Sequence, residues 1–140
     1  MTRSKLGTPV PILKVADVRI NFAYDTDVLG FSPDWDDGGM VSVSRGRCTL
    51  LLCEWEQGAS GSWIWVGVDD CAALHAELAG RGARVRQPPT RFPWALEMQI
   101  EDPDDNVLRL GSEPVAGSQR GQFLDARGRP WDGGPGDHES

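Results

Sequence analysis

The chain has 140 residues, and 21 acidic against 14 basic side chains give it a formal net charge of −7. This length suffices for a hydrophobic core that needs neither disulfides nor a structural metal, and the acidic balance argues against nucleic acid or an anionic membrane surface as a partner. The sequence has no apolar run near the roughly 20 residues of a membrane helix and no signal peptide. Its three cysteines contain no CxxC pair. Together these features predict a cytoplasmic protein.

The first half of the chain reads as a strand, a helix and two further strands. Residues 10–15 are apolar and rich in β-branched side chains, which indicates a strand. Asp17 is suited to begin a helix as its N-cap, and Gly30 is suited to end it. Two more strands are expected at 39–44 and 48–54, joined by a turn at 45–47.

The second half begins in the same order, with a strand and a helix. Residues 63–68 are expected to form a strand, and Asp70 is again placed to cap a helix, which Gly82 ends. Apolar side chains at helical spacing follow that cap. Three strands follow the helix, at 84–86, 96–101 and 107–110, with a turn at 102–106 before the last of them.

The two halves keep a constant offset. Asp17 and Asp70 are 53 residues apart, and Gly30 and Gly82 are 52 apart. A period of this size predicts two copies of one βαβββ unit and therefore an α+β fold. The expected divisions are an N-terminal extension at 1–8, a first module at 9–57, a second module at 58–112 and a tail at 113–140, where glycine and proline are frequent.

Four stretches together resemble the vicinal oxygen chelate superfamily, and within it the glyoxalase/bleomycin-resistance group. They read PVPILKVADV, DVLGF, VGVDDCAALHAELAGRGARV and FPWALEMQIEDPDDNVLRL, within residues 9–112. The resemblance implies two βαβββ modules that form a curved mixed sheet around a cleft, paired in a homodimer. One departure concerns the turn DPDDN, where Asp105 replaces the glycine that is usual in the family.

The same resemblance implies where a metal would be held. Enzymes of the superfamily bind a divalent metal with His, Gln or Glu at equivalent strand positions. Carried onto this chain, those positions are Val10, Leu51, Trp63 and Arg109. Three of these side chains have no suitable donor atom and the fourth is cationic, so we expect neither a metal nor another cofactor.

Aromatic and apolar side chains stand where the metal ligands would be. Six tryptophans are many for this length, and a planar organic ligand favours aromatic faces with a few charges at the rim. Acidic residues around Trp35 would suit a cationic ligand, although they also fit a solvated loop. The predicted ligand-binding residues are Trp63, Trp65, Arg109, Trp94, Glu97, Trp55, Leu51, Cys53, Ile12 and Trp35.

Strand alternation divides the side chains of the sheets between two faces. Ile12, Trp63, Trp65 and Arg109 are expected on the cleft face, whereas Leu13, Ile64, Val66, Leu108 and Leu110 should pack against the helices. Glu97, Gln99 and Glu101 alternate with apolar residues. They indicate either a solvated strand face or a polar cleft wall, in which Glu97 would act as a general base or pair with a cation.

Two hypotheses on function follow. The first is a metal-free protein that binds and sequesters an aromatic or drug-like small molecule, as bleomycin-resistance proteins do, with a small molecule and a second copy of the chain as its partners. The alternative is a lyase or isomerase on the same scaffold with a non-standard or absent metal site, in which Glu97, Arg109 and Cys53 would supply the reacting groups.

Overall fold

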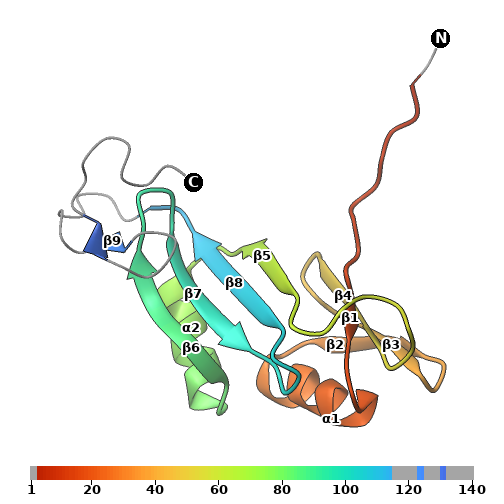
Figure 1. Cartoon of the computed structure of the whole chain (residues 1–140). Coiled ribbons are helices and arrows are strands. Elements are labelled where there is room, and N and C mark those ends of the chain that lie inside the picture. The colour runs from red at the N-terminus through yellow and green to blue at the C-terminus, as the bar shows by residue number, and fades with distance from the viewer. Residues whose placement is uncertain (1–2, 115–122, 125–129, 132–140) are drawn as a thin grey trace. The chain divides into compact units, whose positions relative to one another are not determined.

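The computed structural model describes residues 3–114 and the backbone of 123–124 and 130–131. The chain divides into two compact units, Met1–Ser60 and Gly61–Ser140, each with its own sheet and helix (Figure 1). Most of the tail predicted at 113–140 lies outside the described residues. The module boundaries, the cleft and the homodimer stay predictions. No helix among the described residues is long and apolar enough to cross a membrane.

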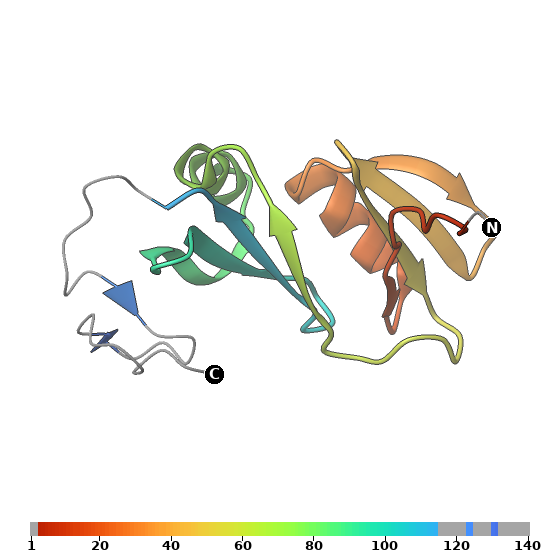
Figure 2. The ribbon, with the colours of Figure 1, turned by 90° about the horizontal axis from the view of Figure 1, so that it is seen from above.

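The first unit contains a four-stranded sheet and one helix. Its elements are β1 (Ile12–Lys14), α1 (Val18–Ala23) with a π-helical continuation η1 (Tyr24–Val28), β2 (Ser32–Asp36), β3 (Met40–Arg45) and β4 (Cys48–Cys53). The strand order is β1-β4-β3-β2, with β1 parallel to β4 and the other pairs antiparallel. The helix packs against β3 and β4 (Figure 2).

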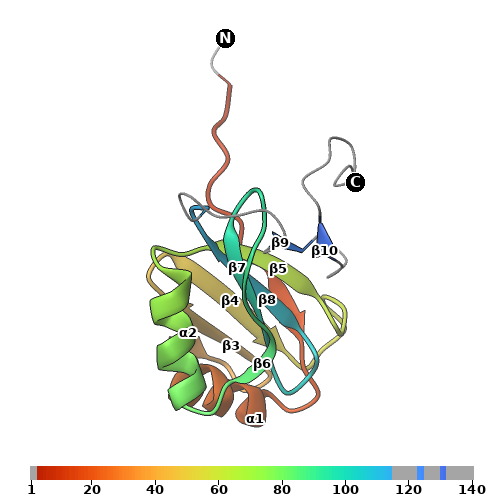
Figure 3. The same cartoon turned by 90° about the vertical axis from the view of Figure 1, so that its left-hand side faces the viewer.

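The second unit repeats this topology. Its elements are β5 (Trp63–Gly67), α2 (Cys71–Gly80), β6 (Arg84–Arg91), β7 (Leu96–Glu101), β8 (Val107–Ser112), β9 (Phe123–Leu124) and β10 (Pro130–Trp131). The order is β10-β9-β6-β7-β8-β5, and β5 is parallel to β8 as β1 is to β4. The helix α2 lies along the β6–β7–β8 meander (Figure 3). The predicted α+β fold of two βαβββ modules is confirmed.

Local signals explain where the helices begin and end. The Asp17 carboxylate accepts hydrogen bonds from the backbone N–H groups of Arg19 and Ile20, and Asp70 accepts one from Ala73. Both residues satisfy donors that the first helical turn leaves free. Gly30 and Gly82 have φ values of 76° and 88°, which a residue without a Cβ adopts at little cost. The predicted caps are therefore confirmed.

The edge strand β2 is not among the strands predicted from the sequence. Residues 31–38 belong to no predicted strand because the segment SPDWD contains proline and two aspartates, which are rare in strands. All five residues are exposed, and the pairing with β3 has a bulge between Pro33 and Trp35. The strand forms because it sits at the sheet edge, where such residues are tolerated. Similarly, β6 extends beyond the expected 84–86 through two register shifts around its prolines.

The cores follow the predicted division of faces. On β4, Leu50 and Leu52 are buried while Leu51 is half-buried. On β7 and β8, Met98, Ile100 and Leu110 are buried on the side that carries α2, and the alternate residues form the opposite face. Each sheet therefore has one face covered by a helix and one face without a helical cover.

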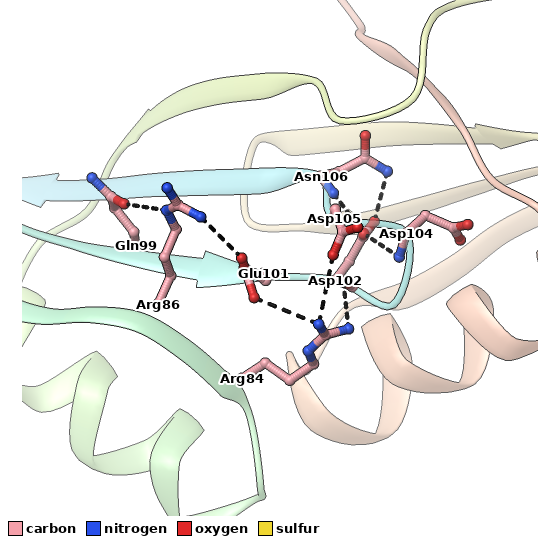
Figure 4. A network of polar contacts seen from close by, with 8 residues as sticks. All are labelled: Arg84, Arg86, Gln99, Glu101, Asp102, Asp104, Asp105 and Asn106. Carbon is pink, nitrogen blue, oxygen red and sulfur yellow. Dashed lines mark hydrogen bonds and ion pairs between the residues drawn. The ribbon is translucent and has the colours of Figure 1, made fainter.

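The turn before β8 is held by a buried carboxylate. Asp102 accepts hydrogen bonds from the backbone N–H groups of Asp104 and Asn106 and from the Asn106 side chain (Figure 4). Asp105 is the one non-glycine residue with a positive φ, 64°, in the described part of the chain. The side chain at this position is tolerated in the left-handed region, but at a conformational cost.

Replacing Asp105 by glycine should therefore raise the free energy of unfolding by about 0.5 kcal/mol. Glycine removes the conformational cost of a positive φ, and part of this gain is offset because glycine has more conformational entropy in the unfolded chain. The ion pair that is lost, Arg84 to Asp105 at 3.6 Å, is exposed and contributes little. Urea denaturation measures the change. The control Asp104→Gly, at an ordinary φ, should lower the stability by about 0.5–1 kcal/mol. Equal changes in both variants would contradict the explanation.

Candidate functional site

Two tryptophans of β5 stand on the face of the second sheet that α2 does not cover. The side chains of β5 alternate between exposed and half-buried, and Trp63 and Trp65 are 51% and 53% exposed. In the parallel pairing, Trp63 lies opposite Val107 and Trp65 lies opposite Arg109. Large exposed aromatic side chains side by side on one strand are uncommon unless they contact a ligand or a partner.

A buried carboxylate connects Trp65 to two further residues of this face. Glu97 on β7 is 1% exposed. Its Oε1 accepts hydrogen bonds from the indole N–H groups of Trp65 (3.0 Å) and Trp94 (2.8 Å). Its Oε2 accepts from Nε (3.0 Å) and Nη2 (2.9 Å) of Arg109. Four N–H donors saturate the two oxygens, so that the buried charge is both paired and hydrogen-bonded.

Two glycines let the Trp65 ring lie against the sheet. A Cβ on Gly111 would come within 3.0 Å of the Trp65 ring and 3.2 Å of Glu97 Cγ, and one on Gly67 would touch the ring at 3.4 Å. With its N–H bound to Glu97 and its ring over these glycines, Trp65 is fixed on one side. Its exposed surface is therefore presented in one orientation.

Trp94 and Trp63 have their own supports. Trp94 stacks on the buried ring of Phe92, with ring centroids 4.8 Å apart and planes at 19°. The guanidinium of Arg86 lies 5.0 Å from the centroid of the Trp63 ring, a favourable cation–π distance. Arg86 is held in turn by Gln99 (3.0 Å) and Glu101 (3.2 Å) (Figure 4).

The second unit thus brings five of the predicted binding residues onto one face, namely Trp63, Trp65, Trp94, Glu97 and Arg109. The interpretation of Glu97 as part of a solvated strand face is wrong, because its side chain is buried and paired with Arg109. Its part in a cleft wall stays a prediction. Gly111, Arg86 and Phe92, which support the tryptophans, were not predicted from the sequence. An isolated glycine at a strand end was the only available signal.

The other five predicted residues belong to the first unit and are arranged differently. Ile12 and Leu51 are half-buried and lie opposite each other, whereas Cys53 is fully buried. Trp55 is 49% exposed, and its ring lies so close to Gly39 that a Cβ there would overlap it. Trp35 is 47% exposed on the edge strand β2. Their part in ligand binding stays a prediction.

The acidic residues around Trp35 are engaged in local hydrogen bonds. Asp34 accepts from the hydroxyls of Ser42 (2.8 Å) and Ser44 (2.6 Å). Asp36 accepts from the backbone of Gly38 and from Arg19, and these two contacts lower the pKa of its carboxyl group. These carboxylates stabilise the β2–β3 hairpin, and they lie in a strand and its turn rather than in the solvated loop that was one of the two interpretations. Their part in binding a cationic ligand stays a prediction.

Cys71 is the first residue of α2, close to Glu97 and the residues that bind it, which together form the Glu97 cluster. Its thiol is buried and donates to the Leu110 carbonyl oxygen at 3.5 Å. Burial, with the nearby charges of Glu97 and Asp70, raises the pKa of this thiol to about 11. The thiol is therefore neutral near pH 7 and is not an activated nucleophile.

Comparison with known proteins decides the family. A model described as "Glyoxalase superfamily protein" matches residues 4–117, which is most of the chain. The chain belongs to the glyoxalase superfamily. This confirms the resemblance drawn from the sequence motifs. No curated protein sequence matches the chain.

Solved structures share the fold of this superfamily member. TnmS3, an antibiotic binding protein from Streptomyces sp. CB03234, has a TM-score of 0.71 at 22% identity, covering 80% of this chain and 99% of that one. The bleomycin-binding protein of Streptomyces verticillus, solved with copper(II)-bleomycin, has a TM-score of 0.68 at 28% identity, covering 79% and 98%. A glyoxalase/bleomycin resistance protein from Streptomyces sp. CB03234 has a TM-score of 0.64 at 24% identity, covering 73% and 96%.

The residues at the metal positions of the superfamily do not fit a metal. Val10 precedes β1 and is 42% exposed. In the strand register, Leu51 lies opposite Ile12 rather than Val10, and Arg109 lies opposite Trp65 rather than Trp63. Neither the four residues predicted for the metal positions nor these two register partners have a side chain suited to bind a metal. Among the described residues, no group of three or more His, Cys, Asp or Glu side chains is placed to hold a metal.

Removing the Glu97 carboxylate tests how much its hydrogen bonds to Trp65, Trp94 and Arg109 stabilise the fold. Glu97→Ala should lower the free energy of unfolding by about 3 kcal/mol, because it leaves a partly buried guanidinium without its counter-ion and two indole N–H groups without their acceptor. Urea denaturation measures this. The control Glu101→Ala, on the same strand but with a side chain 22% exposed, should cost less than about 1 kcal/mol. Equal losses would contradict the central role of Glu97.

Proposed function

We propose that this member of the glyoxalase superfamily is a metal-free protein that binds and sequesters a small planar aromatic molecule. The observation that carries the proposal is the Trp65 ring, half exposed yet fixed by Glu97 and by the two glycines beneath it. A ring held in its binding orientation loses little conformational entropy when a ligand stacks on it. Trp63 and Trp94 extend the aromatic surface on the same face.

Two similar structures support this proposal. One is an antibiotic binding protein, and another is a bleomycin-binding protein that was solved with copper(II)-bleomycin. The enzymatic alternative has weaker support from the site. Glu97 has all its acceptor positions filled, and Cys53 is fully buried, so that neither side chain is presented to a substrate.

The proposal also includes a homodimer, a cytoplasmic location and no cofactor. The strand β5 lies at the edge of its sheet and carries two exposed tryptophans. An apolar surface of this kind is suited to a ligand that is enclosed when a second copy of the chain approaches.

Binding should be detected by tryptophan fluorescence and by the melting temperature, measured against a panel of aromatic and cationic compounds that includes bleomycin. We expect micromolar quenching with thermal stabilisation by at least one planar compound. Trp65→Ala or Trp63→Ala should weaken that compound by more than about fivefold, the equivalent of about 1 kcal/mol. The control Ile20→Ala, an exposed apolar residue on α1, should leave the affinity unchanged. Equal affinity in all three variants would contradict the proposal.

A metal titration tests the metal-free part of the proposal. Adding Zn²⁺, Mn²⁺, Ni²⁺ or Mg²⁺ should leave the melting temperature unchanged, because a ligand that binds only the folded state would raise it. A stabilisation of several degrees by one of these metals, abolished by Glu97→Gln or Glu54→Gln, would contradict the metal-free part of the proposal. Glu54 is included because its carboxylate reaches the N-terminus of α1, where it accepts from the Val18 N–H at 2.8 Å.

A further inference from the structure

The face of the second sheet that carries Trp63 and Trp65 is called the tryptophan face. The carboxylates and the amide oxygen of β7 on this face already accept hydrogen bonds from the protein. Glu97 accepts four N–H donors. Glu101 on the same face pairs with Arg84 at 3.5 Å and with Arg86 at 3.2 Å (Figure 4). The side-chain oxygen of Gln99 accepts from Arg86. The polar side chains of β7 on this face therefore direct their oxygens to residues of the protein rather than to a ligand.

Donors on the same face are open. Arg109 binds Glu97 through Nε and Nη2, and within the described residues no hydrogen bond reaches its Nη1, although 29% of the side chain is exposed. The Trp63 indole N–H, half exposed, and the Gln99 amide nitrogen are likewise without a partner in the described part of the chain. These donors belong to the same face as Trp65. In the strand register Arg109 lies between Trp65 of β5 and Gln99 of β7, and Trp63 is two residues before Trp65 on β5.

Within the described residues, the face therefore offers a ligand open hydrogen-bond donors but few open acceptors, and the two indoles bound to Glu97 add neither. Trp65 and Trp94 use their only polar atom inside the protein, so that they offer a ligand aromatic surface alone. Recognition of a polar group on the ligand is left to the guanidinium of Arg109 and to the neighbouring N–H groups. A guanidinium is suited to oxygen acceptors and most of all to anionic ones, with which its hydrogen bonds are short and strong.

We propose that the ligand of this face is a planar aromatic acid, whose ring stacks on Trp65 and whose carboxylate or phenolate oxygen accepts hydrogen bonds from Arg109. This inference rests on the proposed function and narrows its ligand class. Glu97 has a positioning role in it, since the carboxylate holds the Trp65 ring and the Arg109 guanidinium in register. An aromatic cation is disfavoured, because the described carboxylates of this face are already paired.

Isothermal titration calorimetry on the full chain tests the inference with three probes of one shape: 2-naphthoate, 2-naphthamide and 2-naphthylmethylammonium. We expect the acid to bind about tenfold or more tighter than the amine, with the neutral amide between them. Arg109→Gln should reduce this preference to less than about threefold, since the amide cannot supply a charge-assisted contact.

The matched control is Arg81→Gln. It removes one positive charge at the C-terminal end of α2, where Arg81 pairs with Glu77 at 3.8 Å, and the preference for the acid should persist. If Arg109→Gln does not fold, as judged by circular dichroism, Arg109→Lys keeps the charge beside Glu97 but lacks the planar fork, and the preference should fall by about threefold.

The outcomes separate the inference from the proposed function. Binding of the amide or the amine as tightly as the acid would overturn the inference and leave aromatic binding in place. A preference for the acid that survives in the folded Arg109 variant would also overturn it. Failure of all three probes to bind would count against the aromatic binding surface itself.

Discussion

The exposed face of the second unit depends on the hydrogen bonds and the ion pair of one buried carboxylate, that of Glu97. An ionised carboxylate removed from water is strongly unfavourable unless it is paired and hydrogen-bonded. Here the guanidinium of Arg109 neutralises the charge, and two indole N–H groups occupy the remaining acceptor positions. The requirement to satisfy Glu97 therefore determines where Trp65 and Trp94 lie, and both rings stay partly exposed as a consequence.

The two modules share a topology but differ in their chemistry. Where the second unit pairs Trp65 with Arg109 across its parallel strands, the first pairs Ile12 with Leu51. Met40, which lies opposite Cys53, takes the place that Glu97 has opposite Gly111. The first unit therefore has apolar residues at the positions that correspond to Trp65, Arg109 and Glu97, so that the two units share a backbone topology but not this polar network.

The same positions connect the chain to its superfamily. The resemblance drawn from the sequence implies metal ligands on these strands, and this chain has there an arginine, a tryptophan and apolar residues. Cationic and aromatic groups are suited to bind an organic molecule through stacking and hydrogen bonds, whereas they cannot coordinate a cation. The function of a protein depends on the side chains that its fold carries and not on the fold alone.

The sequence by itself determined the two βαβββ modules, the helix N-caps at Asp17 and Asp70 and the left-handed turn positions, because each is specified by residues near one another in the chain. It also pointed to the tryptophans as a group. Only the tertiary structure decided that Glu97 is buried and bound to Arg109, Trp65 and Trp94, because these residues come from separate segments that the strand register brings together. The edge strand β2 likewise depends on pairing with β3, since its own residues disfavour a strand.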